Sequence, residues 1–205
     1  KALVTARPEA HRIVDDDGSA TPYRQGLSID DRVALEAALD VASEVVAVGL
    51  GGQTAQSCVR SALERGADRG LHVAFDPIEG VAGEKFAAVL ARLAARESPD
   101  ALVVGETGPF AGAEIAGFAA ANLDWPCASR VTALGSENLD VHVDSGDGEL
   151  AAQRKLGVGR QEAVVVSLPV VLGIDAGFTD PGRAALDAAV AGRRADIETV
   201  DLADV

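Results

Sequence analysis

Two glycine-rich segments carry the residue types best suited to holding a phosphate group. The first, Gly49–Thr54, stands between a continuously apolar run, Val45–Val48, and a helical pattern, so it should turn a buried strand into a helix. Glycines at such a turn let backbone N–H groups approach an anion at the positive end of the helix. The second, Gly105–Gly112, follows another apolar run and would meet the first at one edge of a parallel sheet.

Each segment has more than one interpretation. The first is similar to the dinucleotide fingerprint G-x-G-x-x-G, with Thr54 in place of the third glycine and Asp76 near the position of the ribose-binding acid. A tight structural turn, a nucleotide site and a dinucleotide-dependent dehydrogenase site therefore stay open. The second is either a ligand loop or a flexible connection before an alanine-rich helix.

Catalysis by the chain alone is not predicted, because its nucleophiles lack a base. No G-x-S-x-G turn is present, and Ser57 and Ser61 fall inside a predicted helix. The histidines, His11, His72 and His142, have no evident partner. We therefore expect a chain that is not an enzyme by itself.

A metal site is not predicted either. The two cysteines, Cys58 and Cys127, lie far apart, and with the histidines they make no recognisable ligand spacing. We expect buried or half-buried thiols in a reducing compartment. The acidic run at 15–17, followed by Gly18, lacks the alternating ligands of a calcium loop and predicts a polar turn.

Composition limits the partners and the location. With 32 acidic and 18 basic residues the net charge is −14, which disfavours nucleic acid and anionic membranes. No run reaches the ~18 apolar residues of a membrane span, and the start lacks a signal peptide's apolar region, so we expect a cytoplasmic protein. An acidic composition with only three lysines suggests a halophilic host with a salty cytoplasm.

The elements that must position the glycine segments follow from periodicity. Strands are predicted at residues 2–6, 44–49, 71–75, 101–105 and 163–173, the last interrupted by Pro169, and helices at 29–43, 53–66, 81–97, the second half of 108–121 and 181–191. Ser28 is the predicted N-cap of the helix at 29–43, with acids in its first turn. Residues 139–148 predict an antiparallel hairpin. The β-α alternation predicts one α/β domain over residues 1–205, a mostly parallel, doubly wound, Rossmann-like sheet with that hairpin in its C-terminal third.

The segment Val46–Val73 resembles the most recognisable part of the electron transfer flavoprotein beta subunit. There a buried strand and glycine loop lead into an A-Q-x-x-x-R-x-A-L helix, followed by G-A-D-R-x-x-x-V. The matching residues are Ala55, Gln56, Arg60, Ala62, Leu63, Gly66, Ala67, Asp68, Arg69 and Val73. Residues 28–39, Trp125-Pro126 and 162–171 are also similar to family segments, so the resemblance runs along most of the chain.

The resemblance implies a fold related to adenine-nucleotide alpha hydrolase-like domains. It also implies a heterodimer with an alpha subunit that holds the redox-active FAD and receives electrons from an acyl-CoA or other flavin dehydrogenase. In many family members the beta subunit binds AMP as a structural ligand, and in electron-bifurcating members it binds a second FAD. The flavin then does the chemistry, while the protein sets distance and electrostatics.

The resemblance also assigns site residues by position. The implied nucleotide contacts are Thr5, Ala6, Ser28, Leu50, Gly51, Gly52, Gly105, Gly108, Gly112 and Ala113. For partner docking, Leu186 aligns with a leucine that contacts dehydrogenases, and Arg193 and Arg194 stand where the family has a lysine-rich stretch.

The second loop departs most from the family pattern. The family has a D-D-D run followed by N-Q-T-G-Q, whereas Gly108–Gly117 lacks these polar residues, and Glu114 brings a negative charge to where a phosphate should lie. Two alternatives therefore stay open. One is a nucleotide-free scaffold or regulatory subunit of the same fold, and the other is a stand-alone domain that binds or hydrolyses adenine nucleotides.

Overall fold

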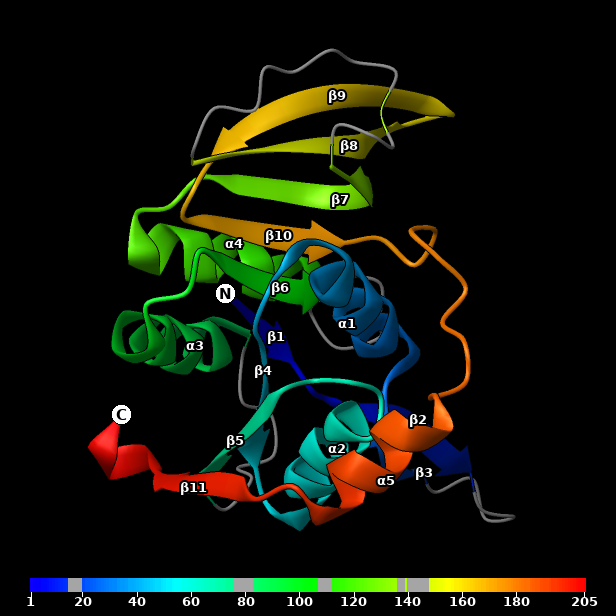
Figure 1. Cartoon of the computed structure of the whole chain (residues 1–205), viewed down its shortest axis with the longest axis vertical. Helices are drawn as coiled ribbons and strands as arrows, with labels where there is room; N and C mark the ends of the chain where they lie inside the picture. Colours follow the sequence, from blue (N-terminus) through cyan, green and yellow to red (C-terminus); the bar gives the residue numbers. More distant parts are fainter. Residues whose placement is uncertain (15–19, 76–82, 107–111, 136–138, 140–147) are drawn as a thin grey trace.

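A mixed β-sheet runs through the computed structural model of the chain (Figure 1). The structure describes residues 1–14, 20–75, 83–106, 112–135, 139 and 148–205, without the side chains of 10–14, 20–25, 112 and 113. Within these residues nine strands form one sheet, in the order β11-β5-β4-β1-β6-β10-β7-β8-β9. The strands are β1 Ala2–Thr5, β4 Val45–Gly51, β5 Arg69–Ala74, β6 Ala101–Gly105, β7 Cys127–Leu134, β8 Glu149–Gly157, β9 Arg160–Ser167, β10 Val170–Ile174 and β11 Ile197–Asp201.

The first seven strands of that order run parallel, and β8 and β9 continue the sheet in antiparallel pairing. A separate antiparallel pair, β2 Pro8–Val14 and β3 Ala20–Leu27, lies beside α2 (Figure 1). The predicted fold class, a mostly parallel α/β sheet with antiparallel strands in the C-terminal third, is therefore confirmed.

Helices cover both faces of the sheet. They are α1 Ile29–Val41, α2 Gln53–Leu63, α3 Gly83–Glu97, α4 Gly112–Leu123 and α5 Leu186–Arg194, with a short 3₁₀ turn at Leu202–Asp204. The apolar sides of α1 and α2 fill one core, and those of α3 and α4 fill the other (Figure 1). None of the described helices is both long and apolar enough to cross a membrane.

The central strands are buried on both faces, which explains their continuously apolar sequences. Every residue of β1, β4, β6 and β10 is buried. Two glycines let α2 lie close to this sheet, because a Cβ on Gly49 or on Gly70 would stand 2.6 Å from a methyl group of Val59. The close packing fixes the start of α2 relative to the end of β4.

Some elements differ from the prediction. The strand expected at 163–173 is two strands, because the chain turns between β9 and β10 at a cis peptide bond, Leu168-Pro169. The last helix begins at Leu186 rather than near 181, where Arg65 Nη1 donates to the Gly182 carbonyl at 2.9 Å and ties the preceding segment to α2. The β2–β3 pair was not predicted. The hairpin expected at 139–148 lies outside the described residues except for Leu139 and Gly148.

Candidate functional site

The glycine loop lies between β4 and α2, at the edge where the parallel strands end. Gly51 has a φ of +124°, a conformation that favours glycine. Gly52 is the N-cap of α2 and supplies no capping side chain, and the first turn of α2 contains no acid. The positive end of α2 therefore meets neither a side-chain cap nor a carboxylate from its own first turn, an arrangement suited to an anion.

His72, on β5, forms a hydrogen bond with the backbone of this loop. Its side chain is buried, and Nε2 lies 2.7 Å from the Gly51 carbonyl oxygen, which makes Nε2 the donor. Nδ1 is buried without a hydrogen-bond partner among the described residues. Sequence reasoning found no partner for this histidine, because its acceptor is a backbone carbonyl on a neighbouring strand.

Asp31 accepts hydrogen bonds from the polar groups at the end of β1. The Thr5 hydroxyl donates to Oδ1 at 2.8 Å, and the Arg7 backbone N–H donates to Oδ2 at 2.6 Å. The Arg7 guanidinium adds three bonds, from Nε to Oδ2 at 2.9 Å and to Oδ1 at 3.2 Å, and from Nη2 to Oδ1 at 2.6 Å. The Asp31 side chain is fully buried and that of Arg7 is 15% exposed, so this is an internal ion pair.

Arg7 also connects β1 to β6. Its Nη2 donates to the Gly105 carbonyl at 2.5 Å. Burial lowers the pKa of Arg7, but the charge of Asp31 and their hydrogen bond outweigh it and raise that pKa above its ordinary value. The guanidinium thus stays charged and joins β1, α1 and β6 in one network.

The first-strand residues assigned to the nucleotide are both buried. The Thr5 hydroxyl is bound to Asp31, and the Ala6 N–H donates to the Val48 carbonyl at 2.8 Å. Ser28 is the N-cap of α1 as predicted, and its hydroxyl accepts from the Asp31 N–H at 3.1 Å. These groups therefore already have partners within the protein.

The sheet brings several assigned residues to one edge. β1 pairs with β4 on one side and with β6 on the other, so Thr5, Leu50 and Gly105 lie near the same ends of adjacent strands. Gly105 also touches α1, since a Cβ there would lie 2.5 Å from the Asp30 backbone carbon. That close approach explains this glycine without any ligand.

The second loop is only partly described. Gly108 lies outside the described residues, and Gly112 and Ala113 form the start of α4, with their side chains also outside them. Glu114 is exposed in the first turn of α4, where it places a carboxylate near the positive end of that helix.

Glu106, directly after β6, is a buried carboxyl that the sequence did not single out. Its Oε2 accepts from the Arg130 N–H, while Oε1 is buried without a hydrogen-bond partner among the described residues. Burial raises the pKa of Glu106, the Arg130 bond opposes this, and the nearby charge of Asp175 raises the pKa further. The backbone of Gly173 makes room for it, since a Cβ there would lie 2.0 Å from Oε1.

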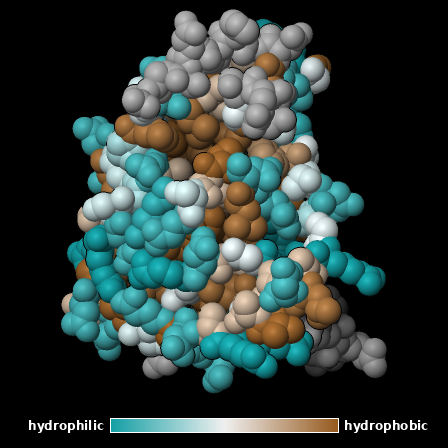
Figure 2. All heavy atoms as spheres, viewed as in Figure 1, coloured by the Kyte–Doolittle hydropathy of each residue, from teal (hydrophilic) through white to brown (hydrophobic). Residues whose placement is uncertain are grey.

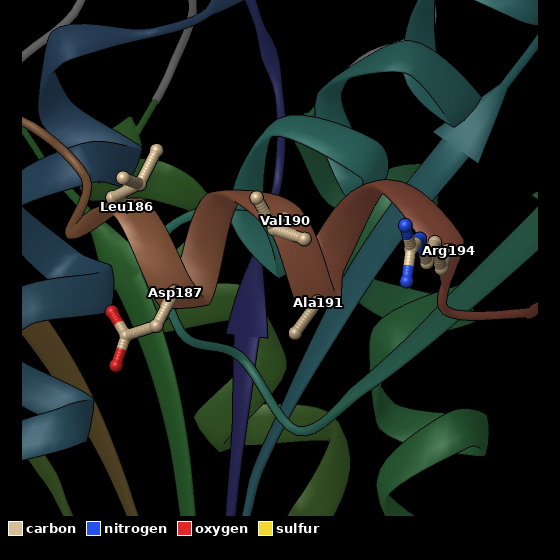
Figure 3. Close-up of a pocket in the computed structure, with 5 residues that line it drawn as sticks. All are labelled: Leu186, Asp187, Val190, Ala191 and Arg194. Carbon is tan, nitrogen blue, oxygen red and sulfur yellow. The ribbon is translucent and has the colours of Figure 1, made fainter.

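The residues assigned to partner docking lie on α5, which presents an exposed apolar side. Leu186 is 81% exposed and Val190 is 46% exposed. With Asp187, Ala191 and Arg194 they line a shallow, open hollow, and Leu186 and Val190 project from the same side of the helix (Figure 3). Hydrophobic surface gathers over α5 in the lower right of Figure 2.

The opposite side of α5 is fastened to α2. Arg60 Nη1 donates to the carbonyls of Gly192 and Ala195, both at 2.5 Å, and so caps the end of α5. Gly192 is buried against α2, because a Cβ there would lie 2.3 Å from the Glu64 nitrogen. Arg193 points back to Glu64 (Nε to Oε1, 3.3 Å), so Arg193 and Arg194 are not equivalent.

Two more residues of the recognisable segment have structural partners. Asp68 accepts from the Val45 N–H at 2.8 Å and fixes the start of β4. Arg69 forms ion pairs with Glu97 at 3.0 Å and with Glu198 at 3.3 Å, which tie β5 to α3 and β11. With Arg60, these contacts account through architecture alone for the three charged residues among the positions that match the family motif.

Metal ligation finds no support within the described ranges, where no group of three His, Cys, Asp or Glu side chains could hold an ion. The acidic run at 15–17 lies outside those ranges. Cys58 is buried and Cys127 is exposed, so the two thiols have different surroundings. Burial, helped by the charge of Asp31, raises the pKa of the Cys58 thiol to about 12.

Comparison with known proteins places these features in a family. A family model described as "Electron transfer flavoprotein domain" matches residues 24–205. The chain is 28% identical over 179 residues to the electron transfer flavoprotein subunit beta of Methylophilus methylotrophus, covering 87% of this chain and 65% of that subunit. It is 28% identical over 214 residues to the human subunit beta, covering 98% of this chain and 76% of that subunit. The chain thus spans between about two thirds and three quarters of these relatives' lengths.

Proposed function

Because this chain belongs to the electron transfer flavoprotein beta-subunit family, we propose that it acts as the beta-type subunit of such a carrier. It pairs with an FAD-bearing alpha subunit and passes electrons from a flavin dehydrogenase to an acceptor, with residues 1–205 acting as one domain without catalysis of its own. The observation that carries the proposal is the family match over residues 24–205. The exposed apolar side of α5, held on a rigid base, supports the docking part of the proposal.

An adenine nucleotide would bind at the glycine loop. The backbone N–H groups at the start of α2 would hold its phosphate, since Gly52 leaves that helix end without a cap or an acid. His72 would keep the loop in place through the Gly51 carbonyl. The redox flavin would supply the electron-transfer chemistry from the alpha subunit, and this chain would contribute position and electrostatics.

A substitution at Gly52 tests this site directly. Gly52→Asp supplies a capping carboxylate to α2 and should expel AMP while leaving the helix intact, because the N-cap backbone (φ −79°) suits aspartate. Gly182→Asp is the matched control, since it makes the same charge change at an exposed glycine with no heavy atom within 4 Å of an added Cβ. Released nucleotide is identified by mass and absorbance after co-expression with the alpha subunit.

A nucleotide-free scaffold is the second candidate. It is favoured by the internal partners of Thr5 and Ala6 and by Glu114 at the start of α4. A yellow 1:1 complex without AMP or a second FAD would support this candidate over the nucleotide-binding one. A stable colourless monomer that forms no complex with the alpha subunit would contradict both. If that monomer retained a nucleotide, it would be a stand-alone adenine-nucleotide domain.

Docking is tested on α5. Leu186→Ala should raise the KM for the dehydrogenase about tenfold while leaving the alpha complex intact, since truncating an exposed anchor removes binding energy at the interface alone. Leu202→Ala, another exposed leucine, is the control. An unchanged KM in the Leu186 variant would rule out this surface as the docking site.

A further inference from the structure

We propose that a basic pocket at the β8–β9 turn binds a tetrahedral oxyanion of the phosphate or sulfate class, at a site separate from the glycine loop. The pocket has a volume of about 140 Å³. Three basic side chains, those of Arg130, Lys155 and Arg160, line it together with Gln161 and the turn at 157–159. They come from three strand segments, β7, β8 and the start of β9, which the antiparallel pairing brings together.

The charge of this pocket is opposite to that of the chain. The chain has a net charge of −14 and only 18 basic residues, yet three of them meet here. Six basic residues outside the pocket form ion pairs in the described part of the chain, such as Arg69 with Glu97 and Arg154 with Glu162. Arg130 and Arg160 form no ion pair within 4 Å of a carboxylate in the described part of the chain.

Lys155 is held in place by Asp175, which follows β10. The Lys155 ammonium donates to Asp175 Oδ1, and the same oxygen accepts from the Gly177 N–H at 2.8 Å. Burial raises the pKa of Asp175, but the bonds from Lys155 and Gly177, with the charges of Lys155 and Arg130, hold that pKa below its ordinary value. Asp175 therefore stays ionised, and an ammonium with three N–H donors keeps two for a ligand.

The pocket keeps an excess of positive charge when both nearby carboxyl groups are counted. Glu106 bonds the Arg130 backbone and Asp175 bonds Lys155, so two carboxyl groups lie near three basic residues. Arginine forks and an ammonium are the donors that phosphate oxygens prefer in proteins.

The turn between β8 and β9 has the backbone of a two-residue hairpin loop. Gly157 pairs with Arg160, and the two residues between them, Val158 and Gly159, have φ values of +48° and +74°. Positive φ at both central residues is the favoured type I′ hairpin geometry, so the hairpin itself explains these angles. The turn places Arg160 at the start of β9, next to the end of β8.

The pocket size restricts the ligand. A volume of about 140 Å³ is well below the roughly 300 Å³ of the smallest typical small-molecule pockets, so a nucleotide does not fit inside. A single phosphate or sulfate group does. The group can be a free anion or the terminal phosphate of a larger molecule that reaches in from solvent.

The test titrates the full chain carrying Gly52→Asp with inorganic phosphate by calorimetry, at constant ionic strength. The added carboxylate at the N-cap of α2 disfavours phosphate binding at the glycine loop, so the titration measures the pocket alone. We expect saturable binding that Arg160→Ala weakens about tenfold, the effect of losing one charge-assisted contact. Arg183→Ala is the matched control, because Arg183 is exposed and outside the pocket, and it should leave the affinity unchanged.

Two results would overturn the proposal. If the heat of phosphate binding does not saturate, or if the Arg160 and Arg183 variants lose phosphate affinity equally, the heat comes from general charge screening and not from binding at the pocket. Absence of phosphate binding, combined with a weaker alpha-subunit complex in Arg160→Ala, would assign the pocket to a carboxylate of the partner instead. The alpha subunit is not needed for the phosphate titration, so it is independent of whether the proposed function is correct.

Discussion

Asp31 lies on the buried side of α1, where a carboxylate is stable only with partners of its own. Ala34, Leu35 and Ala38 follow Asp31 at helical spacing and are all buried, so the spacing places Asp31 on the apolar side of the helix. The partner could not be predicted, because Arg7 is 24 positions away and meets Asp31 only through the packing of α1 on β1. Pairing of this kind depends on tertiary geometry rather than on local pattern.

Removing the charge of Asp31 should be costly. Asp31→Asn leaves the Arg7 guanidinium buried without its counterion, so we expect a loss of about 3–5 kcal/mol in the free energy of unfolding. Glu64→Gln, which breaks the exposed pair with Arg193, should cost at most about 1 kcal/mol. Urea unfolding of both variants measures the difference, and similar losses would show that the Arg7 pair is not special.

Glu106 should make stability depend on pH. Its pKa is higher in the folded chain than in the unfolded one, so its stabilising contribution is complete below the ordinary carboxyl pKa and is lost as pH rises through the raised value. Glu106→Gln removes this titration. The difference in unfolding free energy between variant and wild type should move in favour of the variant between about pH 4 and about pH 8.

The control is Glu114→Gln, an exposed glutamate in the first turn of α4. The glutamine amide can change the unfolding free energy of the Glu106 variant by an amount that does not depend on pH. That amount does not affect the test, which measures how the difference in unfolding free energy changes with pH. A pH-independent difference would mean that Glu106 titrates alike in both states.

The two thiols should react very differently. Burial raises the pKa of Cys58 to about 12 and, with the charge of Glu106, also raises the pKa of Cys127, but Cys127 is exposed at the start of β7 and Cys58 is not. At about pH 8 iodoacetamide should modify Cys127 and spare Cys58 until the chain is unfolded. Mass spectrometry of the native and urea-treated protein reads out both sites, and Cys127→Ser should abolish native labelling. Native labelling of Cys58 would mean that α2 opens readily.

Among the helices and strands, those that are most buried were predicted most accurately from the sequence. The central strands are buried on both faces, so their apolar runs identify them without knowledge of the fold. β8 and β9 carry mixed polar and apolar residues because one side of each faces solvent, and β9 was joined to β10 in the prediction. The start of α5 was misplaced because a long-range bond from Arg65, not a local signal, holds the segment before it.

Two glycines in helices should respond to alanine with opposite signs. Gly192→Ala forces a methyl group into the backbone of α2 and should destabilise the chain by about 1–3 kcal/mol while loosening α5. Gly117→Ala, in α4 with open space around it, should stabilise by about 0.5–1 kcal/mol. Thermal unfolding distinguishes them, and faster hydrogen exchange confined to α5 is expected for the Gly192 variant. Equal effects would contradict the tight contact between α2 and α5.

At the scale of the whole molecule, charge should govern stability more than any single pair. A net charge of −14 on 205 residues produces self-repulsion that salt screens. Raising KCl from about 0.05 M to about 1 M should therefore raise the melting temperature, even though exposed ion pairs weaken. A falling melting temperature would mean that the ion pairs outweigh the repulsion.

The fold class and the glycine loop followed from sequence, and the family match agrees with the resemblance found there. The rest of the candidate site did not follow, because His72, Arg7 and Glu106 act on backbone groups or on residues that adjacent strands bring near. No spacing along the chain encodes those neighbours. The assigned nucleotide contacts and the docking residues stay predictions until the experiments above are done.

Arg60, Asp68 and Arg69, the charged residues among the positions that match the family motif, all serve the architecture. The scaffold uses these contacts with or without a ligand. The second glycine-rich segment is divided, because Gly105 packs against α1 and accepts from Arg7, whereas the sequence from Gly108 lacks the family's polar residues. A protein can therefore lose its nucleotide and keep the residues by which the family is recognised. A match at these motif positions shows a shared scaffold and not a shared ligand.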